Sequence, residues 1–366
     1  MYSEAKGILF IMKVMTIIGA RPQFIKAAVV SRAFHEHCPD VQEIMVHTGQ
    51  HYDANMSDIF FDELDIPRPD YNLGIGGGTH GQNTGRMIEK LEGLMIDVQP
   101  AWVLVYGDTD STLAGALAAA KLHIPVAHVE AGLRSFNPKM PEEINRVLTD
   151  HISDLLFAPT EAGRQNLLNE GIAEEKIKLV GDVMYDASLF YKDKARKPYL
   201  PAELDIQGSD FVLCTIHRAE NTDDPQRLKN IFQGLGANGE QVILPMHPRT
   251  RAKVVDLGIN IPANIWVIDP VGYLEMVWLE GNCRCVATDS GGVQKEAYFH
   301  RKPCITLRDE TEWKELVDIG VNYLAGANAS LIRDYLVKLP ETCAFTASLY
   351  GKGAAASLIC KELRNS

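Results

Sequence analysis

The sequence predicts an α/β fold of two Rossmann-like, doubly wound domains that face each other across a cleft. Segments with strand and helix patterns alternate along almost the whole chain, and the strand segments are continuous apolar runs. The alternation stops once, in the charged segment 192–210, which contains two prolines. Continuous apolar strands that alternate with helices are typical of parallel sheets buried on both faces, and 366 residues suit two such domains.

The break at 192–210 sets the predicted domain limits. We expect an N-terminal Rossmann-like domain over residues 1–191 and a C-terminal one over 192–349. The last amphipathic segment follows the elements of the second domain, and we expect the region 350–366 to pack back on the first domain.

The first domain opens with an apolar strand and an amphipathic helix joined by the turn 19–23. Thr79 follows a glycine-rich stretch and is placed to cap the next long helix. The predicted strands cover 14–18, 43–47, 102–106, 124–129, 155–158 and 178–180. The predicted helices cover 24–37, 54–64, 79–96, 111–121, a segment beginning at 141, and 160–169.

The second domain repeats the pattern after residue 210. Its predicted strands cover 211–216, 241–246, 265–268, 284–288 and 304–307. Its predicted helices cover 224–235, 271–280 and 290–300, and the C-terminal helix covers 354–364.

Composition excludes several classes of partner. A formal net charge of -12 argues against nucleic acid and against an anionic membrane surface, because both reward basic proteins. No run approaches the ~20 apolar residues of a membrane span, and the first residues make a poor signal peptide. Seven scattered cysteines without a CxxC pair suggest neither zinc nor disulfides, so we expect a cytoplasmic protein. Cys214, Cys285 and Cys304 lie in apolar strands and are expected in the core.

Three carboxylates are placed where open α/β sheets carry their chemistry. Asp108 and Glu130 each follow a buried strand, and Glu142 lies in the first turn of a helix. Asp108 has a structural alternative as a helix N-cap, and Glu142 has one as an acid favoured by the helix dipole. The structural alternative is weaker for Glu130, because a carboxylate after a buried strand must be bonded or exposed in the cleft. Acids gathered at one point shift each other's pKa, which allows one to be protonated and another ionised near neutral pH.

Two histidines follow consecutive strands of the second domain. His217 and Arg218 come directly after residues 211–216, with Glu220 and Asn221 close behind. His217 could act as an acid or stabilise a diphosphate, and Arg218 could pair with phosphate. His247 repeats the placement after the next strand. A purely structural role remains the alternative for both histidines.

The sharpest local pattern is the turn that contains Ser290, Gly291 and Gly292. A strand ends, two glycines permit close approach of the backbone, and a helix begins. Free amide groups at such a helix start suit a diphosphate, and Glu296 could bond ribose hydroxyls. An ordinary serine-capped helix is the alternative.

Arg21 and Lys26 flank the first strand–helix turn of the first domain and could supply positive charge there. They could hold phosphate, although each could also be a solvated surface residue. The glycines of 74–78 do not follow a strand at the first β–α turn, so they are weak evidence for a dinucleotide site. No Walker motif, HExxH or His/Cys cluster occurs, and we expect neither a metal nor another cofactor.

Seven short motifs, in order and spacing, resemble the non-hydrolysing UDP-N-acetylglucosamine 2-epimerase family. The resemblance runs from about residue 13 to about residue 350. The motifs are Ile18–Pro22, Thr48–His51, Gly107–Thr109, His128–Arg134, Pro141–Arg146, Thr215–Arg218 and Asp289–Gly292.

The resemblance implies a glycosyltransferase-B-like fold and inversion at C2 of a UDP-2-acetamido sugar, from gluco to manno. The family eliminates UDP across C1–C2 to give a 2-acetamidoglucal and adds UDP back, without metal or nicotinamide. It implies catalytic roles for Asp108, Glu130, Glu142 and His217. It implies a UDP site of Arg21, Lys26, Arg218, His247, Ser290, Gly291, Gly292 and Glu296, and we expect a homodimer.

Departures from the family pattern indicate the substrate. Residues 181–186 read Gly-Asp-Val-Met-Tyr-Asp where relatives acting on UDP-N-acetylglucosamine often read Gly-Asn-Thr. Trp313 stands where those relatives often carry an arginine, so a positive group near the nucleotide is missing. The pattern looks more like the branch that acts on UDP-2,3-diacetamido-2,3-dideoxy-glucuronate, with UDP-N-acetylglucosamine as the next candidate.

Other functions fit the same fold. A UDP-sugar glycosyltransferase is the main alternative, and it would need an acceptor. A non-catalytic nucleotide-sugar sensor would bind without turnover. A nicotinamide oxidoreductase fits least, because the first β–α turn lacks its glycines.

Overall fold

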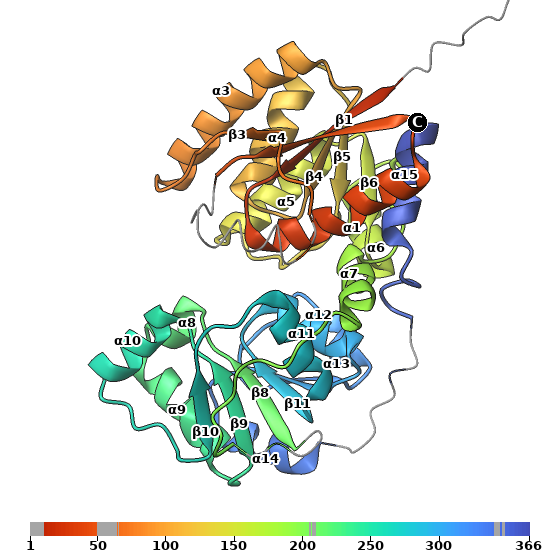
Figure 1. Ribbon diagram of the computed structural model, residues 1–366. Helices are drawn as coiled ribbons and strands as arrows, with labels where there is room; N and C mark the ends of the chain where they lie inside the picture. The colour runs from red at the N-terminus through yellow and green to blue at the C-terminus, as the bar shows by residue number, and fades with distance from the viewer. Residues whose placement is uncertain are drawn as a thin grey trace, which may run out of the picture. The chain divides into compact units, whose positions relative to one another are not determined.

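A computed structural model describes residues 11–49, 64, 66–204, 206, 210–339, 345 and 348–366. The chain divides into two units, Met1–Ala187 with Ser348–Ser366, and Ser188–Ala347 (Figure 1). The boundary falls inside helix α7 (Val183–Lys192). The segment 192–210, expected to be a linker, begins in that helix, and its Leu204 lies buried in an apolar core of the second unit.

Within its described residues, the first unit contains a seven-stranded parallel sheet in the order β3-β2-β1-β4-β5-β6-β7. The central strands are buried on both faces, as their continuous apolar runs predict. The strands are β1 (Met12–Ile18), β2 (Val41–His47), β3 (Tyr71–Asn72), β4 (Trp102–Tyr106), β5 (Val126–Val129), β6 (Leu155–Ala158) and β7 (Ile177–Leu179).

Helix starts in this unit follow the local capping chemistry. Thr79 caps α3 as predicted, whereas α4 is capped by Thr109, so the N-cap alternative for Asp108 is wrong. Apart from Leu64, the expected helix 54–64 lies outside the described residues. The helices are α1 (Arg21–His37), α3 (His80–Val98), α4 (Asp110–Lys121), α5 (Pro141–Ile152), α6 (Glu161–Asn169), α7, α15 (Ala355–Asn365) and the short 3-10 helix η1 (Glu174–Lys176).

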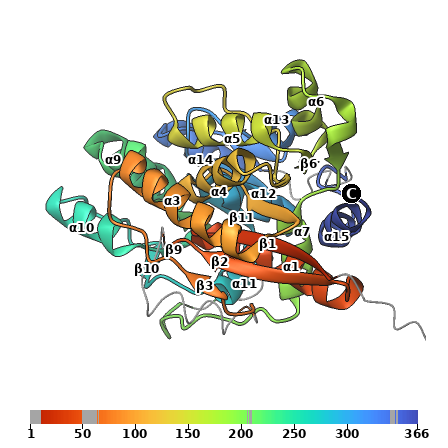
Figure 2. The ribbon, with the colours of Figure 1, turned by 90° about the horizontal axis from the view of Figure 1, so that it is seen from above.

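The C-terminal helix α15 belongs to the first unit and lies beside α1 (Figures 1 and 2). The Cys360 thiol contacts the Val30 carbonyl at 3.8 Å. Arg364 donates to Asp40 at 2.8 Å. Two helices that are far apart in the sequence therefore pack together in the first unit.

The second unit contains a parallel sheet whose described strands follow the order β10-β9-β8-β11-β12-β13. The strands are β8 (Phe211–Thr215), β9 (Gln241–Pro245), β10 (Ile265–Ile268), β11 (Cys285–Thr288), β12 (Cys304–Thr306) and β13 (Asn322–Leu324). The helices are α8 (Ala219–Thr222), α9 (Pro225–Gly236), α10 (Pro248–Asp256), α11 (Tyr273–Asn282), α12 (Gly291–Phe299), α13 (Lys314–Asp318) and α14 (Ala329–Lys338).

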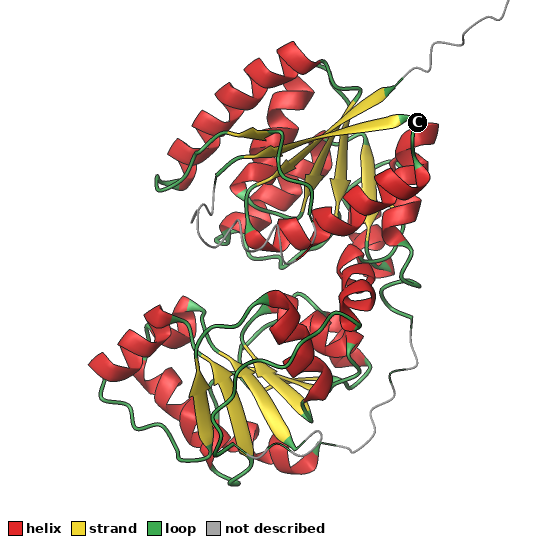
Figure 3. Ribbon diagram, viewed as in Figure 1, coloured by secondary structure: helices red, strands yellow, loops and turns green. Residues whose placement is uncertain are grey.

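The side chains of successive residues in β8 pack into two different apolar cores. Val212 and Cys214 join one core, and Phe211 and Leu213 join the other. Side chains of a strand alternate between the faces of its sheet, so both faces of this sheet are buried. Helices therefore cover the sheet on either side (Figure 3).

Each sheet reverses its strand order beside its first strand, between β1 and β4 in the first unit and between β8 and β11 in the second. In doubly wound sheets, ligands bind at the carboxyl ends of the strands near this reversal. Asp108 follows β4 and His217 follows β8, so the two reversal points are where the candidate residues gather.

Candidate active site

Gln23 joins the two turns at the reversal point of the first unit. Its Oε1 accepts the Gly19 amide at 2.8 Å, and its Nε2 donates to the Tyr106 carbonyl at 2.7 Å. Gln23 is buried, so these bonds fix the turn after β1 against the turn after β4. Arg21 begins α1 in the first of these turns, and its side chain lies outside the described residues.

Lys26 and Glu130 form an ion pair at this point. Both side chains are about nine-tenths buried, and Glu130 adopts φ +75°. A non-glycine residue in the left-handed region stores strain, which proteins retain mainly at functional sites. A Cβ built on Gly107 would lie 3.4 Å from the Lys26 Nζ and from the Glu130 carboxylate, so the pair stands beside the turn that carries Asp108.

Arg146 of α5 bonds the Asp108 carboxylate and also reaches Glu143, with Nη1 3.0 Å from Oε2. Asn145 donates to the Asp108 carbonyl at 3.0 Å. Helix α5 therefore holds the Asp108 turn through two adjacent side chains. The spacing of Glu143 and Arg146 signals the pair within α5, but no sequence signal predicted the contact with Asp108, 38 residues away.

The two acids at the start of α5 have different surroundings. Glu143 is buried and accepts the amides of Ser135 and Phe136 at 2.9 Å, which fixes the loop before α5. Glu142 is exposed, and no hydrogen bond or ion pair links its side chain to any residue that the structure describes. Glu142 is therefore the accessible acid, and Glu143 is a structural one that the sequence analysis did not separate from it.

A further acid–histidine pair lies beside Asp108. Asp110 is buried, its Oδ2 lies 2.9 Å from His80 Nδ1, and its Oδ1 accepts from Asn145 at 3.3 Å. The His80 side chain is mostly exposed. No sequence signal connected these residues, because His80 and Asp110 lie on different helices.

Asp289 organises the reversal point of the second unit. This buried carboxylate accepts the amides of His217 and Arg218 at 3.1 Å, and the Asn221 amide group at the same distance. The His217 side chain is half exposed, with Nδ1 3.4 Å from Asp289. His217 and Arg218 thus lie beside the turn of Ser290, as their positions after neighbouring strands predict.

Ser290 caps α12, and its Oγ accepts the Val293 amide at 3.4 Å. A Cβ on Gly291 would overlap the Glu312 carboxylate, so any side chain at this position would have to displace Glu312. Gly292 is exposed at the start of the same helix. The backbone at the helix start is therefore open to a ligand at Gly292.

Glu312 stands over this turn and bonds Arg308 at 2.8 Å. Burial opposes its charged form, but Arg308, a backbone hydrogen bond and Arg218 together outweigh burial, and the pKa of Glu312 lies below its usual value. Trp313 donates to the Gly291 carbonyl at 2.8 Å. Arg308 therefore supplies a buried positive group near a position where the sequence analysis found one missing.

The two remaining predicted residues of this unit are Glu296 and His247. Glu296 is half-buried on α12. The pKa values of Tyr273 and Glu280 are raised well above their usual values, first by burial of these two groups and second by the nearby Glu296 carboxylate. His247 is exposed and caps α10, accepting the Arg249 amide at 3.2 Å. The cap is the structural role that we left open for His247.

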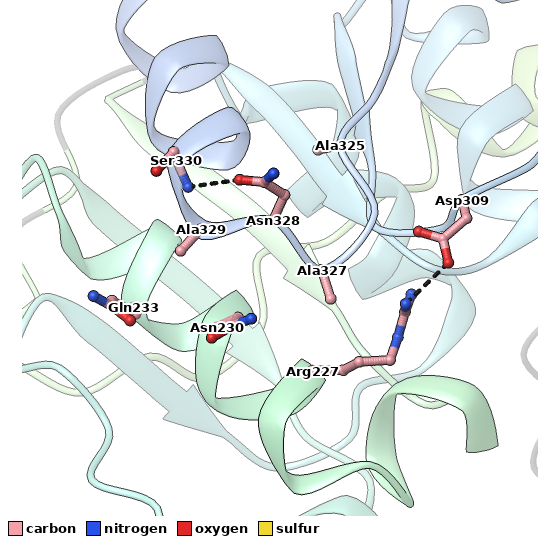
Figure 4. A pocket seen from close by; sticks show the side chains of 9 residues that line it. All are labelled: Arg227, Asn230, Gln233, Asp309, Ala325, Ala327, Asn328, Ala329 and Ser330. Carbon is pink, nitrogen blue, oxygen red and sulfur yellow. Dashed lines mark hydrogen bonds and ion pairs between the residues drawn. The ribbon is translucent and has the colours of Figure 1, made fainter.

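A pocket of about 590 Å³ opens on the second unit between α9 and the start of α14 (Figure 4). Arg227 lines it, bonding Asp309 at 2.9 Å and Asn221 at 3.0 Å. None of the predicted site residues lines this pocket. The pocket is connected to the candidate site through Asn221, which accepts a hydrogen bond from Arg227 and donates one to Asp289.

Two features of the described residues bear on other functions. No helix there has the length and apolar character needed to cross a bilayer. No group of three or more His, Cys, Asp or Glu side chains there is arranged to hold a metal ion.

Comparisons with known proteins agree with this architecture. Residues 33–364 match the family model described as UDP-N-acetylglucosamine 2-epimerase. The chain is 55% identical to UDP-2,3-diacetamido-2,3-dideoxy-D-glucuronate 2-epimerase of Pseudomonas aeruginosa, over 96% of this chain and 99% of that protein. It is 46% identical to UDP-N-acetylglucosamine 2-epimerase of Methanocaldococcus jannaschii, over 90% and 92%.

Solved structures of such proteins share the fold. The crystal structure of the M. jannaschii UDP-GlcNAc 2-epimerase in complex with UDP-GlcNAc and UDP matches 97% of this chain and 100% of that one, with 44% identity and a TM-score of 0.86. The Neisseria meningitidis UDP-GlcNAc 2-epimerase bound to UDP-GlcNAc matches the same shares, with 32% identity and a TM-score of 0.85. The glycosyltransferase-B-like class predicted for the two α/β units is confirmed.

Proposed function

Because this chain belongs to the UDP-N-acetylglucosamine 2-epimerase family and is an isomerase of that type, we propose that its substrate is UDP-2,3-diacetamido-2,3-dideoxy-D-glucuronate. The observation that carries this proposal is the 55% identity, over almost the full length of both chains, to the P. aeruginosa protein of that name. The sequence pattern at 181–186 and at Trp313 independently favours the same branch. UDP-N-acetylglucosamine is the next candidate.

The proposed reaction inverts C2 from gluco to manno through elimination and re-addition of UDP. Loss of the C2 proton and of UDP gives a 2-acetamidoglucal, and UDP then adds back as a proton reaches the opposite face of C2. Moving one proton between two faces needs more than one acid–base group. Asp108, Glu130 and Glu142 are the proposed groups, and the exposed carboxylate of Glu142 contrasts with the bonded carboxylates of the other two.

The leaving diphosphate needs positive charge and hydrogen-bond donors. His217 stabilises or protonates it in this proposal, and the open helix start at Gly292 supplies amide groups. Lys26, which pairs with Glu130 in the first unit, could shift toward phosphate when substrate binds. The full proposed UDP site is Arg21, Lys26, Arg218, His247, Ser290, Gly291, Gly292 and Glu296.

The setting of this activity is part of the proposal. We infer a homodimer in the cytoplasm, where UDP-sugars are made. The manno-configured product would serve as a precursor of surface polysaccharide.

The test compares kcat/KM for the diacetamido uronate and for UDP-N-acetylglucosamine, with C2 followed by NMR in D₂O and no acceptor present. We expect a manno-configured product, deuterium at C2 and a preference for the uronate. Equal rates, or a preference for UDP-N-acetylglucosamine, would overturn the substrate. Absence of both product and glycal, with turnover only when an acceptor is added, would favour the glycosyltransferase.

A further inference from the structure

His128, in β5, is fully buried and has a partner at each ring nitrogen. Its Nδ1 lies 2.7 Å from Asp150 Oδ1, and its Nε2 lies 2.7 Å from the Gly107 carbonyl oxygen. A carbonyl oxygen only accepts hydrogen bonds, so Nε2 must carry a proton. The charge of the ring then depends on whether the second proton sits on Nδ1 or on Asp150.

The other contacts of Asp150 put that proton on His128. Its Oδ2 accepts from the Gly132 amide at 3.1 Å and from Arg134 Nη1 at 2.7 Å. Both of these donors favour the ionised carboxylate, although burial opposes it. An ionised Asp150 needs a donor at Nδ1, which makes the ring an imidazolium.

Charge balance supports the same state. Arg134 also binds Glu170 in a two-point contact, with both N–O distances 2.7 Å. With a protonated His128, the cluster of His128, Asp150, Arg134 and Glu170 contains two cations and two carboxylates, and the half-exposed His151 lies 3.3 Å from Glu170. A neutral imidazole would leave a net negative charge in a largely buried place, and burial penalises unbalanced charge.

The His128–Asp150 pair connects the two turns that carry the proposed acids. At one end His128 bonds the carbonyl of Gly107, the residue before Asp108. At the other end Asp150 bonds the amide of Gly132, two residues after Glu130. Glu130 adopts a positive φ, which costs energy in a residue other than glycine, so its turn needs outside contacts to hold this conformation.

We propose that His128 is a positioning residue, held as an imidazolium by Asp150, that fixes the turns of Asp108 and Glu130 relative to each other. Its part in C2 epimerisation rests on the proposed function, whereas its charge does not. His128 is buried beneath these turns and acts through them, without contacting the reacting atoms.

The charge is tested on the wild-type chain by NMR of ¹⁵N-labelled histidine, with the His128 signals assigned by their loss in His128→Gln. We expect both ring nitrogens of His128 to carry a proton at neutral pH, because each faces an acceptor, the Gly107 carbonyl oxygen and the Asp150 carboxylate. A ring with one unprotonated nitrogen at this pH would overturn the proposal. This readout is taken on the wild-type chain and is independent of substrate.

The positioning role is tested by steady-state kinetics with both UDP-sugars, on His128→Gln, Asp150→Asn, their double variant and His35→Gln. His35 is exposed on α1 and serves as the control. We expect kcat to fall about tenfold to a hundredfold in each single variant while KM stays within about threefold, because misplaced groups lose transition-state contacts. The double variant should be no slower than the slower single variant.

Unchanged kcat in folded His128→Gln, or independent, multiplying losses in the double variant, would overturn the positioning role. Circular dichroism and the melting temperature identify folded variants. A wild-type chain that turns over neither UDP-sugar would refute the proposed function, and the NMR result would then stand separately as evidence on the charge of His128.

Discussion

The carboxylate of Asp289 accepts the backbone amide of His217 at 3.1 Å, across 72 residues of sequence. The same carboxylate holds Arg218 and Asn221, so one buried acid fixes the turn after β8 against the turn after β11. In the first unit, neutral Gln23 makes the corresponding bridge between the turns after β1 and β4. In each unit a buried side chain therefore bridges the two turns at the strand reversal.

We predict that Asp289→Asn destabilises the second unit by about 1–3 kcal/mol, because an amide group would point a donor at backbone donors. UDP affinity should fall as the turn of His217 loosens. Urea unfolding and calorimetric titration with UDP measure the two effects. Asp309→Asn, which removes a surface ion pair with Arg227, should change stability by less than about 1 kcal/mol. Equal effects of the two substitutions would contradict the prediction.

We predict that Arg146→Lys lowers kcat about tenfold to a hundredfold. The two Nη atoms of the planar Arg146 guanidinium bind Asp108 and Glu143 separately. Lysine keeps the positive charge, but its single ammonium group cannot bind both acids in this way. Arg164 also bridges two acids, Glu161 and Glu174, but at the surface. Arg164→Lys should therefore leave kcat unchanged. Steady-state rates of the two variants are compared, and a normal kcat in Arg146→Lys would show that catalysis does not need the two-acid contact of the Arg146 guanidinium.

Gly132 and Gly171 share φ +81° but differ in surroundings. A Cβ on Gly132 would overlap the Gly163 carbonyl oxygen and lie 2.7 Å from its carbon, whereas nothing lies within 4 Å at Gly171. We predict a loss of about 1–2 kcal/mol for Gly171→Ala, from conformation alone, and about 3–5 kcal/mol for Gly132→Ala. Urea unfolding measures both, and similar losses would show that the backbone near Gly163 yields easily.

His47 makes stability depend on pH. Burial lowers its pKa from 6.5 to about 4, and this effect outweighs an opposing hydrogen bond with Asn72. Between those values the unfolded chain binds a proton that the folded chain does not, so stability falls as pH drops from about 6.5 to about 4. The free energy of unfolding lost in this way is about 3 kcal/mol once the pH is below about 4, and none is lost above about pH 6.5.

His47→Gln should remove this dependence, so its stability relative to wild type should rise as pH falls through the same range. Thermal unfolding at a series of pH values measures it, with exposed His37→Gln as the control. Parallel pH profiles for wild type and His47→Gln would rule out His47 as the source.

The sequence was informative wherever structure depends on neighbours along the chain. Strand β4 and helix α5 begin where the pattern predicts, because an apolar run and a proline at a helix start act locally. Thr79 caps α3 for the same reason. Helix α7 was missed, and it begins two residues after Gly181 within a stretch that we had not assigned to any element.

By itself, the sequence determined the α/β class, the order of most elements, and the placement of Asp108, Glu130 and His217 after buried strands. Only the tertiary structure decided which charges meet. Lys26 pairs with Glu130 across 104 residues, and His128 with Asp150 across 22. It also separated exposed Glu142 from buried Glu143, which are neighbours in sequence. Periodicity and capping act within a few residues, whereas ion pairing depends on which strand ends the sheet brings together.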